Sequence, residues 1–260
     1  TCNTKSKVHF AANEVEANCT IIKLNCTIGI MLELKIGHRG AGKEAPENTL
    51  ESFGEAIKEG ANAIELDIRA TKDKKLVVFH DEKLGRLTGE PGVVADYTLS
   101  QLLNFDILGS KEHVPTLAEA LDFIDSKVSR ILLEIKEPGT EAEVIKEIRK
   151  RKLEDRCIII SFHEEAISNA KKLEPSIETG LIYASYKGAY KNPIEAALAL
   201  KARYVLPLYH FTHTKNIEDA HKNGLKVIVW TINDKDEARE FAEKGADGIA
   251  SDYPEILKGL

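Results

Sequence analysis

The stretch Glu59-Gly60-Ala61-Asn62-Ala63-Ile64-Glu65-Leu66-Asp67-Ile68 contains the end of a helix and a complete strand. Gly60 suits the left-handed position that closes a helix. After it, Glu65 and Asp67 share one face of the strand, because side chains alternate, and the aliphatic residues share the other. The same pattern returns at Lys244-Gly245-Ala246-Asp247-Gly248-Ile249. The repetition fits a fold built from one αβ unit.

Short apolar runs alternate with amphipathic runs along the rest of the chain, which is typical of parallel strands joined by helices. Three helix starts carry a capping residue with an acid three positions later: Asn48 with Glu51, Thr116 with Glu119, and Asp234 with Glu237. Nine runs are predicted strands: Leu34–Gly37, Ala63–Ile68, Leu76–Phe79, Ile131–Ile135, Cys157–Ser161, Thr179–Ile182, Tyr204–Leu206, Val227–Thr231 and Gly248–Ala250.

One of these runs, Leu76–Phe79, cannot be a parallel neighbour of Ala63–Ile68. The link between them is residues 69–75, and a parallel crossover needs a dozen residues or more. We therefore interpret the run as an antiparallel arm, which leaves eight parallel strands. That number, in a chain of 260 residues, predicts a (β/α)₈ TIM barrel. Residues 70–115 become a small insertion after strand two, made of loops with one short helix near Thr98–Leu103.

Composition restricts the classes of partner. The chain has 42 acidic and 36 basic residues and a net charge of −6, which argues against binding to nucleic acid. No run approaches the roughly 18 apolar residues that span a bilayer, so we expect no stable membrane insertion and a cytoplasmic location. The sequence does not indicate an oligomeric state.

Residues 1–30 differ from the rest of the chain. They hold three of the four cysteines, show no sustained periodicity and precede the only methionine, Met31. We interpret 1–30 as an extension foreign to the barrel domain, which would be 31–260; the alternative is a genuine arm or small hairpin. The fourth cysteine, Cys157, lies in an apolar run and is expected to be buried and unreactive.

Polar residues gather at the ends of the predicted strands, where barrel enzymes carry their chemistry. Glu65 and Asp67 lie on one strand and Glu134 on the next. Because neighbouring strands lie about 4.8 Å apart, these three carboxylates can converge on one point. Three oxygen ligands without cysteine or a histidine pair favour a hard cation, Mg²⁺ or Ca²⁺.

Cationic and titratable residues surround the carboxylates. Arg39 and Lys136 are suited to binding a phosphate. The unperturbed pKa of a histidine side chain lies near neutrality, so His38 and His80 are suited to act as an acid and a base. A single histidine at a strand end is more often structural, and the carboxylates taken singly would suit ion pairs. Their joint placement favours a reaction site. Trp230, the only tryptophan, either packs in the barrel or forms a wall of that site.

These residues stand in ordered motifs that resemble the glycerophosphodiester phosphodiesterase family over nearly all of residues 32–255. The motifs are His38-Arg39-Gly40, Pro46-Glu47-Asn48-Thr49, Glu65-Leu66-Asp67, His80-Asp81, Pro115-Thr116-Leu117, Glu134-Ile135-Lys136, Ser161-Phe162, Trp230-Thr231-Ile232-Asn233, and Asp247-Gly248-Ile249 followed by Asp252-Tyr253-Pro254. Any one of them is weak evidence, whereas the ordered set is specific.

The resemblance implies a distorted (β/α)₈ barrel that hydrolyses glycerophosphodiesters to sn-glycerol 3-phosphate and an alcohol. It implies the following roles: Glu65, Asp67 and Glu134 bind the divalent ion, His38 and His80 are the acid and base, Arg39 and Lys136 hold phosphate, and Phe162 and Trp230 line the glycerol or leaving-group side. Glu47 would support the site, while for Asn48 we prefer the helix cap. The nucleophile is water or the neighbouring glycerol hydroxyl acting through a cyclic phosphate, and the resemblance favours the hydroxyl.

Two other functions compete with this one. A related phospholipid phosphodiesterase would want an apolar rim around the site, which the sequence does not display. A catalytically inactive glycerophosphodiester-binding module would not need two histidines placed for proton transfer. The retention of both with all three carboxylates therefore favours the hydrolase.

Overall fold

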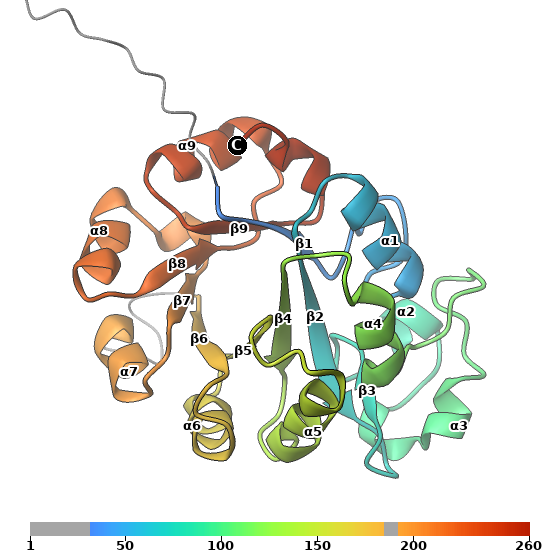
Figure 1. Cartoon of the computed structure of the whole chain (residues 1–260). Coiled ribbons are helices and arrows are strands. Elements are labelled where there is room, and N and C mark those ends of the chain that lie inside the picture. Colours follow the sequence, from blue (N-terminus) through green and yellow to red (C-terminus); the bar gives the residue numbers. More distant parts are fainter. Residues whose placement is uncertain (1–31, 185–191) are drawn as a thin grey trace, which may run out of the picture.

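The computed structural model describes residues 32–184 and 192–260, so the predicted extension 1–30 and Met31 lie outside the described residues. Within them the strands form one sheet closed into a barrel, surrounded by helices (Figure 1). The strands are β1 (Leu34–His38), β2 (Ala63–Ala70), β3 (Leu76–Val78), β4 (Arg130–Ile135), β5 (Cys157–Ser161), β6 (Glu178–Tyr183), β7 (Tyr204–Pro207), β8 (Lys226–Val229) and β9 (Gly248–Ser251). Each of the nine predicted runs coincides with one of these strands.

The helices alternate with the parallel strands, as the sequence predicts. They are α1 (Leu50–Lys58), α2 (Gly85–Thr88), α3 (Leu99–Leu102), α4 (Leu117–Ile124), α5 (Glu141–Arg151), α6 (Glu164–Leu173), α7 (Pro193–Ala199), α8 (Thr214–Lys222) and α9 (Lys235–Glu243), with short 3₁₀ turns η1 (Val94–Asp96), η2 (Tyr209–Phe211) and η3 (Pro254–Leu257). In the part of the chain that the structure describes, no helix has the length and apolar character needed to cross a membrane.

The sheet order is β1-β9-β8-β7-β6-β5-β4-β2-β3, and β1 also pairs with β2, which closes the ring. Every neighbouring pair in the ring is parallel, whereas β3 runs antiparallel to β2 outside it. The (β/α)₈ TIM barrel and its antiparallel arm are thus confirmed.

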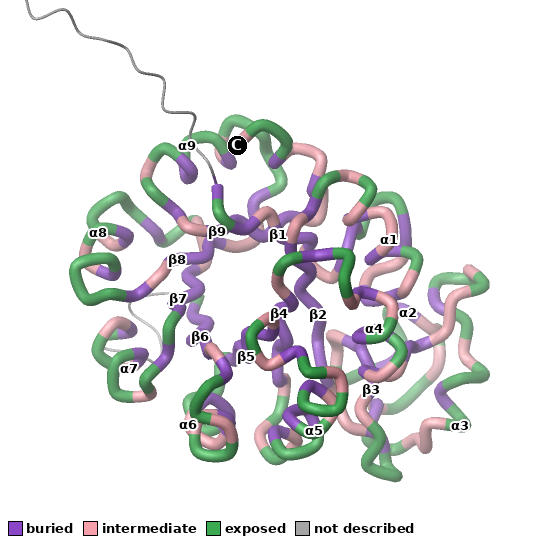
Figure 2. The backbone as a smooth tube through the Cα atoms, viewed as in Figure 1, coloured by how far each residue is buried: buried purple, intermediate pink, exposed green. Residues whose placement is uncertain are grey.

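Alternation along β2 shows how the strand sequence divides the barrel into an inner and an outer core. Ile64, Leu66 and Ile68 point outward into an apolar cluster shared with the helices. A separate cluster fills the interior and includes Ile36 and Leu132. Figure 2 shows the buried ring of strands and the exposed outer sides of the helices. Glu65 and Asp67, on the inner face of β2, are thereby enclosed at one end of the interior.

The segment between β3 and α4 is more ordered than the sequence analysis predicted. The expected helix near Thr98–Leu103 is present as α3, but α2 and η1 were not predicted. Apolar residues of this segment, among them Leu87 and Ile107, form a small core with Val77 of β3. This tertiary burial stabilises helical turns too short to stand out in the sequence.

The predicted start of α1 is one residue too early. Thr49, and not Asn48, is the N-cap, and its Oγ1 accepts a hydrogen bond of 3.1 Å from the backbone N of Ser52. Asn48 lies outside the helix with φ +60°. Its side chain is engaged elsewhere, as the site geometry shows.

Candidate functional site

The register of the barrel brings the predicted polar residues together. His38 at the end of β1 pairs with Glu65, and Asp67 pairs with Glu134 on β4. A cavity of about 150 Å³ lies at this end of the barrel. Eight of the nine predicted site residues line it: His38, Arg39, Glu65, His80, Glu134, Lys136, Phe162 and Trp230. The ninth, Asp67, is 1% exposed and lies within the same cluster.

The three carboxylates converge as the strand pattern predicts. Oxygen atoms of Glu65, Asp67 and Glu134 lie within 4.8 Å of one another, and all three residues are buried. Burial and the neighbouring charge of Asp67 raise the pKa of Glu65 to about 8, and the same two causes raise the pKa of Glu134. The cluster therefore holds more negative charge than its present partners stabilise.

Two cations offset part of this charge. The Nζ of Lys136 lies 3.1 Å from Asp67 Oδ1 and 2.6 Å from Glu134 Oε1. The Nε of Arg39 lies 3.3 Å from Asp67 Oδ2. Burial alone would raise the pKa of Asp67, but these two side chains lead the charges that lower it to about 2. Asp67 is the carboxylate that stays ionised.

A divalent cation fits the remaining groups. Among the described residues, Glu65 Oε1 is buried without a hydrogen-bond partner. It belongs to a set of three carboxylates, which are the oxygen donors that Mg²⁺ and Ca²⁺ prefer. A bound cation would favour the ionised forms of Glu65 and Glu134, whose pKa values are raised without it.

The turn after β1 aims Arg39 at this cluster. Arg39 has φ +56°, and its backbone N donates to Glu65 Oε2 at 2.9 Å. The following Gly40 has φ +92°, and a Cβ added there would stand 2.2 Å from Ser52 Oγ. Only glycine fits this close approach to α1. The predicted supporting residue, Glu47, accepts a 3.0 Å hydrogen bond from Arg39 Nη1.

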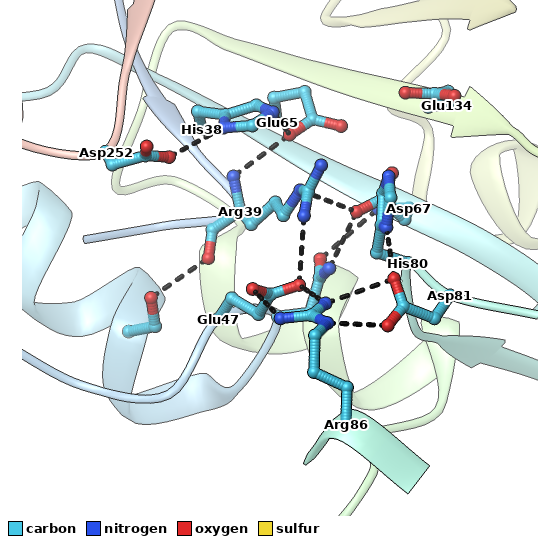
Figure 3. Close-up of polar contacts among 12 residues, drawn as sticks. His38, Arg39, Glu47, Glu65, Asp67, His80, Asp81, Arg86, Glu134 and Asp252 are labelled. Carbon is cyan, nitrogen blue, oxygen red and sulfur yellow. Dashed lines mark hydrogen bonds and ion pairs between the residues drawn. The ribbon is translucent and has the colours of Figure 1, made fainter. Parts of the chain in front are cut away.

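His38 is held by a carboxylate from the far end of the chain. Its Nδ1 lies 2.7 Å from Asp252 Oδ1, and its Nε2 lies 4.0 Å from Glu65 Oε2 (Figure 3). Asn233 Nδ2 donates to the other oxygen of Asp252 at 2.7 Å. Burial would lower the pKa of His38, but the hydrogen bond to Asp252 and the charge of Glu65 raise it overall.

His80 has a similar arrangement. Its Nδ1 lies 2.6 Å from Asp81 Oδ1, and the ring lines the cavity. Burial dominates here and lowers the pKa of His80. Since a carboxylate accepts and does not donate, the Nδ1 of each neutral imidazole carries the proton, and each Nε2 is left as the atom that exchanges protons.

Three polar residues around the site had no assigned role in the sequence analysis or a different one. Asn48 donates through Nδ2 to Asp67 Oδ2 at 2.7 Å and accepts from Asp67 N at 3.3 Å, so its interpretation as a helix cap was wrong. Asp252 and Asp81 stood in quoted motifs without a role. For Asp81 the signal was its position next to His80; Asp252 lies 214 residues from its partner.

Part of the cavity lining is apolar. Phe162 follows β5 and Trp230 follows β8, and their rings meet edge to face with centroids 5.6 Å apart. Trp230 Nε1 donates to Leu206 O at 2.8 Å, which fixes the indole. Both aromatic residues therefore lie in the cavity lining, which also contains the aliphatic side chains of Leu132, Ile160, Ile182, Leu206 and Ile228.

Comparisons with known proteins agree with these observations. The model of the glycerophosphoryl diester phosphodiesterase family matches residues 38–256. A glycerophosphodiester phosphodiesterase of Caldanaerobacter subterraneus subsp. tengcongensis is 37% identical over 241 residues, which cover 88% of this chain and 98% of the relative. One from Bacillus subtilis is 31% identical over 253 residues, 86% of this chain and 85% of the relative.

Solved structures give the same result. A phosphodiesterase of Oleispira antarctica in complex with the product sn-glycerol-3-phosphate superimposes with a TM-score of 0.79 and 29% identity, covering 86% of this chain and 95% of the other. The glycerophosphodiester phosphodiesterase of Thermotoga maritima has a TM-score of 0.72 and 30% identity, covering 86% and 96%. The resemblance and the fold predicted from the motifs are both confirmed.

Proposed function

This chain belongs to the glycerophosphoryl diester phosphodiesterase family, and on that premise we propose that it hydrolyses glycerophosphodiesters to sn-glycerol 3-phosphate and an alcohol, with a divalent cation, Mg²⁺ or Ca²⁺, as cofactor. One observation carries the proposal. Two carboxylate-bound histidines, two cations and three buried carboxylates line or adjoin a single cavity. That set is suited to phosphodiester hydrolysis.

Arg39 and Lys136 would bind the phosphate. Both side chains line the cavity and are already directed at its anionic end by Asp67. A cation held by a buried carboxylate needs little reorganisation when charge develops on the phosphate oxygens. The fixed guanidinium and ammonium groups would therefore stabilise the transition state more than the ground state.

Glu65, Asp67 and Glu134 would hold the divalent ion. Once bound, the ion would supply Lewis-acid stabilisation of negative charge on the phosphodiester. Asp67 enters this set ionised through Lys136 and Arg39, whereas Glu65 gives up a proton to join it.

His38 and His80 would transfer the protons through Nε2. One histidine removes a proton from the nucleophile, and the other protonates the leaving alkoxide. Asp252 and Asp81 hold the proton of each neutral ring on Nδ1, which leaves Nε2 free to accept a proton. They also stabilise the imidazolium that forms on either ring. The nucleophile is water or the neighbouring glycerol hydroxyl, and the same two histidines serve either route.

Phe162 and Trp230 would contact the carbon atoms of the substrate. Their edge-to-face pair belongs to the apolar part of the cavity lining. A glycerophosphodiester joins an anionic phosphate to the carbon chain of glycerol. The division of the cavity lining into a charged part and an apolar part matches that chemistry.

The test is product formation from glycerophosphocholine and glycerophosphoethanolamine in the presence of Mg²⁺, Ca²⁺ or EDTA. A coupled dehydrogenase measures sn-glycerol 3-phosphate. We expect metal-dependent product from the wild-type protein and none from His80→Ala, which should still bind the ion. Glu65→Ala should weaken the response to added metal. Metal-independent product would refute the carboxylate site, and full activity of His80→Ala would refute its catalytic role.

A further inference from the structure

Arg86 lies on α2, in the segment between β3 and α4, and is not among the residues that line the cavity. Its side chain is 47% exposed. Nevertheless, its guanidinium makes four hydrogen bonds to two carboxylates: Nη1 and Nη2 donate to Glu47 at 2.8 and 2.7 Å, and Nε and Nη2 donate to Asp81 at 2.6 and 3.1 Å (Figure 3). Both carboxylates are thus held in a forked, planar geometry.

Each of these carboxylates has a second partner that belongs to the site. Glu47 Oε1 accepts from Arg39 Nη1 at 3.0 Å, and Asp81 Oδ1 lies 2.6 Å from His80 Nδ1. One guanidinium therefore stands directly behind both a phosphate-binding residue and a proton-transferring residue. The two carboxylates come from different parts of the chain, since Glu47 precedes α1 and Asp81 follows β3.

Charge gives this arrangement a second effect. Glu47 and Asp81 both stay ionised, because hydrogen bonds from Arg86 contribute to lowering the pKa of each, to about 2 for Asp81. Two ionised carboxylates close to a phosphate site would repel the substrate. The positive charge of Arg86 offsets part of that repulsion, while its planar fork fixes the direction of both carboxylates.

An exposed ion pair by itself usually adds little to stability. We therefore expect Arg86 to orient Glu47 and Asp81 and to contribute little to the free energy of unfolding. Without it, Asp81 loses two of its hydrogen bonds and is free to turn, so His80 loses the group that fixes its ring. Glu47 would lose its two hydrogen bonds from Arg86 and keep the one from Arg39.

We propose that Arg86 is a positioning residue that holds Arg39 and His80 in their reactive orientations through Glu47 and Asp81. The inference rests on the proposed phosphodiesterase function for its kinetic consequence. It also gives the ordered segment around α2 a role, because this segment places Arg86 beside the site.

Arg86→Lys keeps the charge and removes the fork. The matched control is Arg149→Lys, because Arg149 is 52% exposed and its Nε donates to Glu174 at 2.9 Å, away from the cavity lining. We expect Arg86→Lys to reduce kcat/KM by at least about tenfold, the scale of one charge-assisted hydrogen bond. KM should rise through Arg39 and kcat should fall through His80. Both variants should melt close to the wild-type temperature.

A double variant checks the route. If Arg86 acts on His80 through Asp81, Asp81→Asn combined with Arg86→Lys should lower kcat by clearly less than the product of the two single effects. Activity of Arg86→Lys within twofold of wild type, or kcat effects that multiply in full, would overturn the proposal.

A spectroscopic readout separates this inference from the proposed function. In ¹⁵N-histidine spectra, with His80 assigned from its loss in His80→Gln, Arg86→Lys should shift the His80 Nδ1 resonance. His221, which pairs with Asp247 at 2.8 Å, should stay unchanged. If the wild-type protein hydrolyses no glycerophosphodiester, the proposed function fails, while this comparison still decides whether Arg86 positions His80. An unshifted His80 resonance would overturn the positioning role of Arg86.

Discussion

Replacing Asp252 by asparagine tests the role of His38 without removing a candidate metal ligand. Both carboxylate oxygens of Asp252 accept hydrogen bonds, Oδ1 from His38 Nδ1 at 2.7 Å and Oδ2 from Asn233 Nδ2 at 2.7 Å. An amide has one acceptor oxygen, so Asp252→Asn must lose one of these contacts. If the amide nitrogen faces His38, the ring is driven to the tautomer with its proton on Nε2, which cannot act as a base.

The magnitude follows from the charge on His38 during proton transfer. A hydrogen bond to a charged group contributes about 1.5–3 kcal/mol, which corresponds to a loss of roughly 10- to 150-fold in kcat. The pH dependence should shift as well. Asp252 helps to raise the pKa of His38, so its neutralisation lowers that pKa and moves the limb governed by His38 to lower pH. The direction is the same whether His38 is the acid or the base.

The assay is release of sn-glycerol 3-phosphate from glycerophosphocholine between pH 5 and 9, together with a metal titration. Asp247→Asn is the matched control, because Asp247 pairs with His221 outside the cavity lining at a similar distance of 2.8 Å. Asp252→Asn should keep the metal affinity of the wild type. Activity within twofold of wild type and an unshifted profile would show that the Asp252 carboxylate does not assist His38.

Three further predictions concern the metal, the thiol and the barrel core. Metal-free protein at pH 7 should release protons on binding Mg²⁺ or Ca²⁺, because burial and the charge of Asp67 raise the pKa of Glu65 to about 8; calorimetry in two buffers should show less release for Glu65→Gln. Burial raises the pKa of the Cys157 thiol to about 12. In a variant with Cys2, Cys19 and Cys26 changed to serine, a disulfide reagent at pH 8 should therefore label the denatured chain but not the native protein. Rapid labelling of the native protein would contradict the burial of Cys157. Gly180→Ala would place a Cβ 2.5 Å from Leu206 Cδ1 and should lower the free energy of unfolding in urea by about 1–3 kcal/mol, whereas Gly54→Ala on α1, with 3.5 Å to its nearest neighbour, should not destabilise the protein.

Alternation of side chains made the carboxylate cluster predictable from sequence. Glu65 and Asp67 must share a face of β2, and the parallel register then places Asp67 opposite Glu134. Asn48 was not predictable in this way. A capping pattern describes it as well as it describes Thr49, and only the packing of the turn against β2 directs Asn48 to Asp67. Local signals place strands and helices, whereas the choice between adjacent polar residues depends on tertiary contacts.

The unordered appearance of residues 70–115 in sequence has a related cause. Their helical turns are four residues or shorter, too few to show a helical period. What orders them is burial of scattered apolar residues, such as Leu87 and Ile107, against β3. A segment whose sequence shows no regular period can therefore still place a side chain such as Arg86, which makes four hydrogen bonds to Glu47 and Asp81.

Closure of the barrel and completion of the site are the same structural event. β1 pairs with β2 on one side and with β9 on the other, with Gly37 opposite Ser251. His38 follows Gly37, and Asp252 follows Ser251. These two residues form the 2.7 Å contact that orients the imidazole. His38 thus receives Glu65 from one neighbouring strand and Asp252 from beyond the other. An opened barrel would expose two sheet edges and would also separate His38 from Asp252, so the proton transfer proposed for His38 depends on the closed ring.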